Sequence, residues 1–158
     1  MSYTDTMLYL AADHRGFGLK ESLKHYLTKE GIAFEDYGAS ELDPKDDYVD
    51  YGASVAKKIA EAPEEHRGIL ICGSGVGMDI VANKVPRVRA ALVHSSHQAK
   101  AARTDDDANV LVLDADETNH ELSLDIVRTW LATPFSGLER HRRRLEKLAA
   151  FERSIITA

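Results

Sequence analysis

A single cysteine stands at the rim of a glycine-rich turn, and together they could bind and deprotonate a small ligand. The apolar run Ile69–Ile71 is typical of a buried strand, Cys72 follows at once, and glycines occupy positions 73, 75 and 77. Glycine lets the backbone approach a ligand with its N–H groups directed inward, and the helix expected near Met78 adds positive partial charge. We therefore predict a loop that holds an anion, or an oxygen that becomes one, beside a thiol.

Two plainer interpretations of this segment stay open: a tight turn without a ligand, and an inert buried cysteine. The spacing is not the dinucleotide-binding fingerprint, because the third glycine comes too early, and no Gly-Lys-Ser/Thr closes a Walker loop. If Cys72 acts as a base, we expect the inward N–H groups and the helix N-terminus to lower its pKa.

Composition narrows the class of protein. The chain has 158 residues and 44% apolar residues, as expected for one globular domain over 1–158. Twenty basic against 26 acidic residues give a net charge of −6, which disfavours nucleic acid or an anionic membrane as a partner. One cysteine excludes an internal disulfide, and neither a signal peptide nor a membrane span is visible. We expect a cytoplasmic protein whose residues 1–6 are flexible.

Strand and helix patterns alternate along the chain. We expect strands at 7–12, 32–37, 69–71, 89–93 and 110–113. We expect helices from 17 to about 30 and at 51–62, 96–104, 117–133 and 138–153, with a loop over 38–50. This alternation predicts a doubly wound, Rossmann-like α/β fold, with five parallel strands and helices on both faces. Such sheets bind ligands at the carboxyl ends of their strands, where Asp13-His14 and Cys72–Gly77 would lie.

The last predicted helix carries a cluster of basic residues. Arg140 and Arg144 are four residues apart, so they share a helix face and suit a phosphate group. The alternative is a solvated basic face that pairs with carboxylates. Because this helix follows the last strand, we expect it to leave the sheet and pack on a second subunit.

With these pieces assembled, the chain resembles ribose-5-phosphate isomerase type B and its relative, galactose-6-phosphate isomerase. The match covers about 8–144, and its strongest parts are Ala12–Gly16, Gly68–Gly77 with Ala82–Lys84, Asn109–Leu111 and Arg140-His-x-x-Arg144. The resemblance implies an aldose–ketose isomerase, most directly for ribose 5-phosphate, working through a cis-enediolate with no metal or other cofactor. It also implies a homodimer or tetramer with shared active sites.

The resemblance assigns roles to individual residues. It implies that Cys72 is the base, as in the family's cysteine branch, since Met78 and Asp79 stand where another branch has a glutamate. Ser74 would assist the base. Asp13 would bind sugar hydroxyls, His14 would lie near the substrate, and Tyr48 would line the pocket. The enediolate oxygens would be held by the backbone of Gly73, Gly75, Val76 and Gly77, and the phosphate by Arg140 and Arg144, across a dimer interface.

The sequence departs from the family at the ring-opening residue. Asp105 and Asp106 stand where the family usually has His-Asn, the histidine of which opens the sugar ring. Asp105 would then be the catalytic acid and Asp106 a substrate contact, although a carboxyl group is ordinarily ionised at neutral pH. Asp107 would supply a like charge that helps Asp105 keep a proton. His97 is a second candidate for this role, and a solvated helix cap is the plain alternative for the aspartates.

A second departure follows the fifth strand. The family's Gly-x-Arg turn, whose arginine helps to bind phosphate, is replaced by Asp114-Ala-Asp116. Carboxylates beside a phosphate dianion are repulsive unless arginines neutralise them. Three alternatives to the leading hypothesis therefore stay open: an isomerase of another or an unphosphorylated sugar, a non-catalytic sugar-phosphate-binding protein, and a metal enzyme built on the carboxylates.

Overall fold

The computed structural model describes residues 7–157, so the expected flexibility of residues 1–6 lies outside the described part. Five parallel strands form one sheet in the order β2-β1-β3-β5-β4. The strands are β1 Met7–Ala12, β2 Phe34–Asp36, β3 His66–Cys72, β4 Ala90–Leu92 and β5 Val110–Asp114. The helices are α1 Phe17–Lys29, α2 Tyr48–Glu61, α3 Val76–Ala82, α4 Ser96–Asp106, α5 His120–Ala132 and α6 Glu139–Ile156. The predicted fold class is confirmed.

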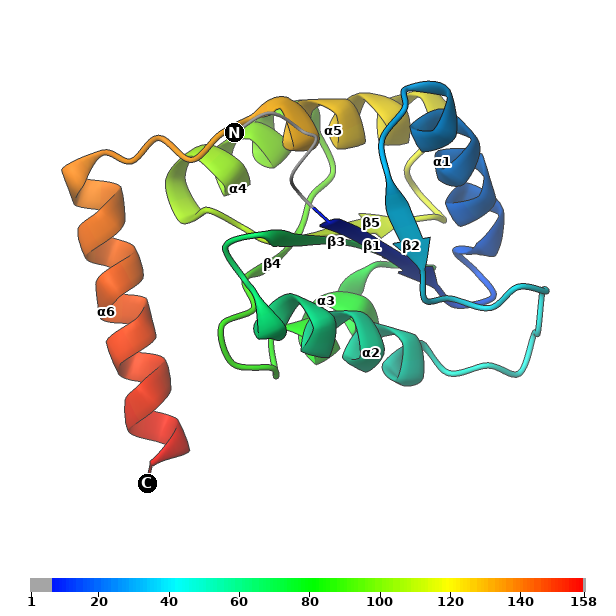
Figure 1. The fold of residues 1–158 in the computed structure, drawn as a ribbon. Helices are drawn as coiled ribbons and strands as arrows, with labels where there is room; N and C mark the ends of the chain where they lie inside the picture. The colour runs from blue at the N-terminus through cyan, green and yellow to red at the C-terminus, as the bar shows by residue number, and fades with distance from the viewer. Residues whose placement is uncertain (1–6, 158) are drawn as a thin grey trace.

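Helices cover both faces of the sheet, as Figure 1 shows. Successive residues of a strand point to opposite faces of the sheet, so alternating side chains of the central strands belong to two separate hydrophobic cores. Leu10 of β1 belongs to the core beneath α1, α4 and α5, whereas its neighbour Ala11 belongs to the core beneath α2 and α3. The three central strands are therefore apolar over most of β1 and β5 and over Ile69–Cys72 of β3.

The strand register brings Cys72 and the loop after β1 to the same edge of the sheet, at the carboxyl ends of the strands. Ala12 of β1 is level with Ile71 of β3, and Cys72 is level with Asp114 of β5. The connections diverge here, since α1 crosses one face of the sheet and α3 the other. This is the kind of topological switch point at which open α/β sheets bind ligands.

Several element boundaries differ from the sequence prediction. Helix α2 begins at Tyr48 rather than at residue 51, so Tyr48 is a helix residue and not a loop residue. Asp50 in its first turn favours the earlier start, because an acidic side chain there complements the helix dipole. Helix α5 begins later than expected, at His120, because the Asn119 side chain accepts a hydrogen bond from the backbone N–H of Leu122 and caps it.

The last helix extends away from the rest of the molecule (Figure 1). Its only buried residue is His141 within the described chain, and it carries exposed apolar side chains at Leu148, Phe151 and Ile155. These three recur at helical spacing and form one apolar stripe. None of the helices within residues 7–157 combines the length and the apolar character that a bilayer crossing requires.

Candidate active site

The loop after β1 packs directly against the strand that carries the cysteine. The backbone N–H of Asp13 donates to the carbonyl of Ile71 at 3.3 Å. A Cβ atom on Gly16 would lie 2.7 Å from that same carbonyl oxygen, so only glycine permits this approach. Main-chain contact thus fixes the Asp13–Gly16 loop beside Cys72.

Cys72 is buried, with 4% of its surface exposed, at the end of β3. Burial raises the pKa of its thiol, while hydrogen bonds from the backbone N–H groups of Met78, Gly75 and Gly77 act to lower it. The negative charge of Asp13 also raises this pKa. The net shift is upward, so the expectation of a lowered pKa is wrong: desolvation outweighs the amides.

The glycine-rich turn does form the predicted nest of backbone N–H groups. Gly75 adopts the left-handed conformation (φ 76°) and precedes α3, which turns the amides of the loop toward the sulfur. A Cβ on Gly77 would lie 2.8 Å from the ring of Tyr48, so that ring closes over the turn. Ser74 is exposed, and its hydroxyl accepts a 3.4 Å hydrogen bond from the backbone N–H of Val76.

Hydrogen bonds fix the side chains of Asp13 and His14. Asp13 is 6% exposed, and its Oδ1 accepts from the backbone N–H groups of Arg15 and Gly16 at 3.0 and 3.1 Å. His14 reaches the loop before α2, where its Nδ1 lies 2.7 Å from Asp46 Oδ1. The structure therefore brings together seven predicted site residues: Asp13, His14, Tyr48, Cys72, Gly73, Gly75 and Gly77. Val76 and Ser74 complete the same loop.

Three polar pairs at this edge were missed by sequence reasoning. Besides His14–Asp46, the Nδ1 atom of His94 lies 2.6 Å from Asp114 Oδ2. Arg15 crosses Gly73, where a Cβ would lie 2.5 Å from its Nε, and pairs with Asp116. Each pair joins residues at least 20 positions apart, so no local pattern in the sequence signals it.

The four remaining predicted residues lie elsewhere in the chain. Asp105 and Asp106 end α4, just before β5 begins, and so lie at the amino-terminal edge of the sheet, opposite Cys72. Arg140 and Arg144 belong to α6, which starts beside the end of α4: Asp105 Oδ1 lies 3.7 Å from His141 Nδ1. Both arginines are exposed. One chain therefore does not bring these four residues to the thiol.

The other two acidic residues, Asp107 and Asp114, have partners that the sequence did not indicate. Asp107 pairs with Arg103 at 2.7 Å and with Arg89 at 3.3 Å, so it adds little like charge beside Asp105. Burial disfavours the ionised form of Asp114, but hydrogen bonds from Thr118, His94 and Glu117 outweigh it and lower its pKa. His97, the other predicted ring-opening candidate, is exposed in the first turn of α4.

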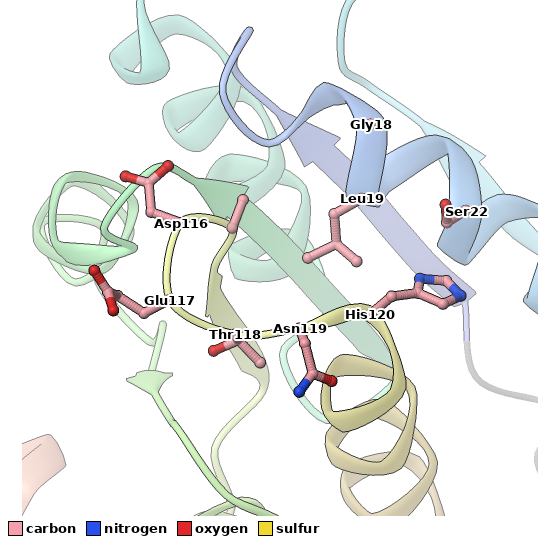
Figure 2. Close-up of a pocket in the computed structure, with 9 residues that line it drawn as sticks. Gly18, Leu19, Ser22, Asp116, Glu117, Thr118, Asn119 and His120 are labelled. Carbon is pink, nitrogen blue, oxygen red and sulfur yellow. The ribbon is translucent and has the colours of Figure 1, made fainter.

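An open cavity of about 470 Å³ lies at this edge of the sheet, and Cys72 is not among the residues that line it. Figure 2 shows its lining residues. It is bounded by the start of α1 and the turn between β5 and α5, including Leu19, Asp116 and His120. Within residues 7–157 no three His, Cys, Asp or Glu side chains gather as a metal would require. This edge of the sheet thus offers a buried thiol, a nest of amides and a carboxylate–imidazole pair, which suits proton transfer on a small polar ligand.

Comparison with known proteins agrees with this chemistry. The Ribose/Galactose Isomerase family model matches residues 8–148, which is nearly the whole chain. The chain belongs to this family. Among its relatives, the probable ribose-5-phosphate isomerase B of Mycoplasma pneumoniae is 42% identical over 92% of this chain and 95% of that protein. The family is one of sugar-phosphate isomerases, so the chain is an intramolecular oxidoreductase.

Family members differ in the sugar that they are named for. The crystal structure of ribose-5-phosphate isomerase B from Mycoplasma genitalium with bound ribulose 5-phosphate matches with a TM-score of 0.90 and 38% identity, over 94% of this chain and 97% of that one. A D-erythrulose-4-phosphate isomerase from Pectobacterium atrosepticum is 36% identical over 81% of this chain and 84% of that protein.

Proposed function

We propose that this family member interconverts ribose 5-phosphate and ribulose 5-phosphate, with Cys72 as the base. The observation that carries the proposal is the thiol itself, set against the N–H groups of the Gly73–Gly77 turn and beside Asp13. The relative with bound ribulose 5-phosphate supports the choice of sugar.

The chemistry follows from these groups. The Cys72 thiolate takes the proton from C2 of the open aldose, and negative charge develops on O1, where backbone N–H groups stabilise it. The proton on O2 then moves to O1 through the cis-enediolate, and Cys72 returns its proton to C1. Ser74 would assist the base, Asp13 would bind the sugar hydroxyls, and Tyr48 would line the pocket.

We further propose that the site is completed by a second subunit of a homodimer, alone or within a tetramer. Asp105, Asp106, Arg140 and Arg144 lie at the far edge of the sheet from Cys72, so they would reach a thiol only in a neighbouring chain. The exposed apolar stripe of α6 supports such packing, since an uncovered stripe is a typical contact surface. A cytoplasmic location stays a prediction.

The decisive experiment compares the unaltered protein with Cys72→Ala. The unaltered protein is expected to convert ribose 5-phosphate to ribulose 5-phosphate, and Cys72→Ala to lose about a hundred- to ten-thousand-fold in kcat, as for removal of a positioned base. Calorimetric binding of ribulose 5-phosphate should survive in the variant. Normal turnover by Cys72→Ala would refute the assignment of the base. Saturable binding by the unaltered protein without proton exchange would favour a sugar-phosphate-binding protein.

A second candidate, isomerisation of a different sugar, is favoured by the pair of Arg15 with Asp116. A carboxylate at this place repels a phosphate dianion, and Arg15 is already engaged by it. A panel of pentoses, hexoses and tetroses, with and without phosphate, separates the two functions. Inert ribose 5-phosphate beside a reactive neutral sugar would establish the second.

A further inference from the structure

An aldose that closes into a ring has no acidic C2 proton until the ring opens. In ribose 5-phosphate the ring joins C1 to O4, so a proton must leave the O1 hydroxyl and another must reach O4. Cys72 would take the C2 proton, and the backbone N–H groups of the Gly73–Gly77 turn would stabilise the oxyanion. The transfer that opens the ring therefore needs a further acid–base group. This inference rests on the proposed function.

His14 has the geometry for that transfer. Its Nδ1 lies 2.7 Å from Asp46 Oδ1, and the same oxygen accepts from the His14 backbone N–H at 3.0 Å. Because carboxylate oxygens accept hydrogen bonds, the ring proton lies on Nδ1 and Nε2 is left to exchange a proton with a ligand. No residue within 7–157 hydrogen-bonds to Nε2, and 31% of the side chain is exposed.

Asp46 is placed to stabilise the charge that forms on His14. Its side chain is only 6% exposed, and Oδ2 has no hydrogen-bond partner among the described residues. Burial first, and then the charge of Asp46 and its hydrogen bond with the Tyr51 side chain, raise the pKa of Tyr51. A carboxylate 2.7 Å from the ring stabilises the imidazolium that forms while the ring carries a transferred proton. Asp46 therefore acts as a positioning residue that also balances the imidazolium.

The other candidates near the thiol fit less well. Asp13 Oδ1 already accepts hydrogen bonds from the backbone N–H groups of Arg15 and Gly16. Burial, and also the charge of Asp13, raise the pKa of Cys72. Asp105 is half exposed and could reach the sugar only from a second subunit, and Asp107, which is paired with Arg103, does not supply the like charge that would help it to keep a proton. His14, by contrast, directly follows Asp13 in the loop that packs on Ile71, next to Cys72.

We infer that His14, held by Asp46, opens the sugar ring in this protein. Nε2 takes the proton from the O1 hydroxyl, C1=O1 forms, and the C1–O4 bond breaks with its electron pair going to O4. The imidazolium then gives its proton to O4, so the histidine returns to its starting state. Cys72 next takes the C2 proton of the open aldehyde.

The test uses the fact that ribulose 5-phosphate cannot close a five-membered ring, because its O5 carries the phosphate. The variants are His14→Gln and Asp46→Asn, with His25→Gln on the exposed surface of α1 as a matched control. Two rates are measured for each: conversion of ribose 5-phosphate, and exchange of the C1 proton of ribulose 5-phosphate with solvent. Since both sugars carry the same phosphate, weaker binding slows both.

Loss of ring opening slows only the first rate. We expect His14→Gln to lose about a hundredfold or more on ribose 5-phosphate, as for removal of a general acid–base, and at least tenfold less on exchange. Asp46→Asn should show the same sugar-selective loss, smaller in size, and His25→Gln no loss. Equal losses on both sugars, or a selective loss in Asp105→Asn alone, would overturn the role of His14. Absence of both activities in the unaltered protein would instead refute the proposed function.

Discussion

Asp13 directly follows β1 and Cys72 ends the adjacent strand β3, and burial and the charge of Asp13 both raise the pKa of the Cys72 thiol. Burial is the larger cause, and three backbone N–H groups oppose both. Cys72 is thus held mainly as a thiol. A thiolate that forms next to a substrate is more basic for the same reason, and so better able to remove a carbon-bound proton.

Removal of the Asp13 charge should lower the pKa of Cys72. A nearby negative charge disfavours the thiolate, so Asp13→Asn shifts the titration toward lower pH, while Asn can still accept the backbone hydrogen bonds of the loop. The ultraviolet absorbance of the thiolate against pH measures the shift, and the sequence has only one cysteine. Cys72→Ala supplies the baseline. An unchanged or raised midpoint would contradict the effect of Asp13.

The amide turn should not tolerate a side chain at Gly75. Its φ of 76° costs a non-glycine residue about 1–2 kcal/mol. The new Cβ would also lie 2.4 Å from Leu92 Cδ1. We expect Gly75→Ala to lower the free energy of unfolding in urea and to reduce turnover.

Gly18 is the matched control for Gly75. A Cβ at Gly18, in the first turn of α1, meets nothing within 4 Å. Gly18→Ala should therefore be neutral, or stabilise the protein by up to about 1 kcal/mol, because glycine costs a helix conformational entropy. Equal urea midpoints for the two variants would argue against a strained turn at Gly75.

Asp116 should weaken the affinity for a phosphorylated sugar. Asp116→Ala frees Arg15, which lies over Gly73, and removes a negative charge from this edge. An exposed pair contributes about 0–1 kcal/mol, so stability should change little, while KM for ribose 5-phosphate should fall by up to about fivefold. Asp125→Ala, which breaks an exposed pair with Arg128 on α5, should leave KM unaltered. A rise of KM in Asp116→Ala would mean that this carboxylate contacts the sugar.

Shared sites predict complementation between two inactive variants. In a mixed dimer of Cys72→Ala and Arg144→Ala, one site has both defects and the other has neither. Co-expression with random pairing should therefore restore about a quarter of the activity of the unaltered protein, given a two-fold symmetric dimer. Each variant alone stays inactive. No recovery in the mixture would place all the working residues of a site in one chain.

Local sequence patterns predicted the sheet, the thiol and its amide nest, because each depends on a contiguous run of residues. Apolar runs identify buried strands, and the glycines of 73–77 mark a turn whatever surrounds it. The start of α2 was missed because the preceding aspartate-rich stretch has no apolar period, so Tyr48 was assigned to a loop.

The missed features depend on strand order. Asp46 meets His14 and Asp116 meets Arg15 only because the loops after β1 and β5 and the one before α2 converge at one edge of the sheet. The direction of the Cys72 pKa shift was wrong for a related reason. The motif shows the amides, whereas the desolvation comes from the core beneath α2 and α3.

The bare backbone of Gly16 has a consequence for how new specificities could arise. Since its lack of a side chain lets the first loop rest on the Ile71 carbonyl, main-chain contacts set the distance between the Asp13–Gly16 loop and the strand that ends at Cys72. Outer side chains can then be exchanged to accept a longer, shorter or less charged sugar while the point of proton removal stays where it is. A relative named for a four-carbon sugar phosphate is consistent with such freedom.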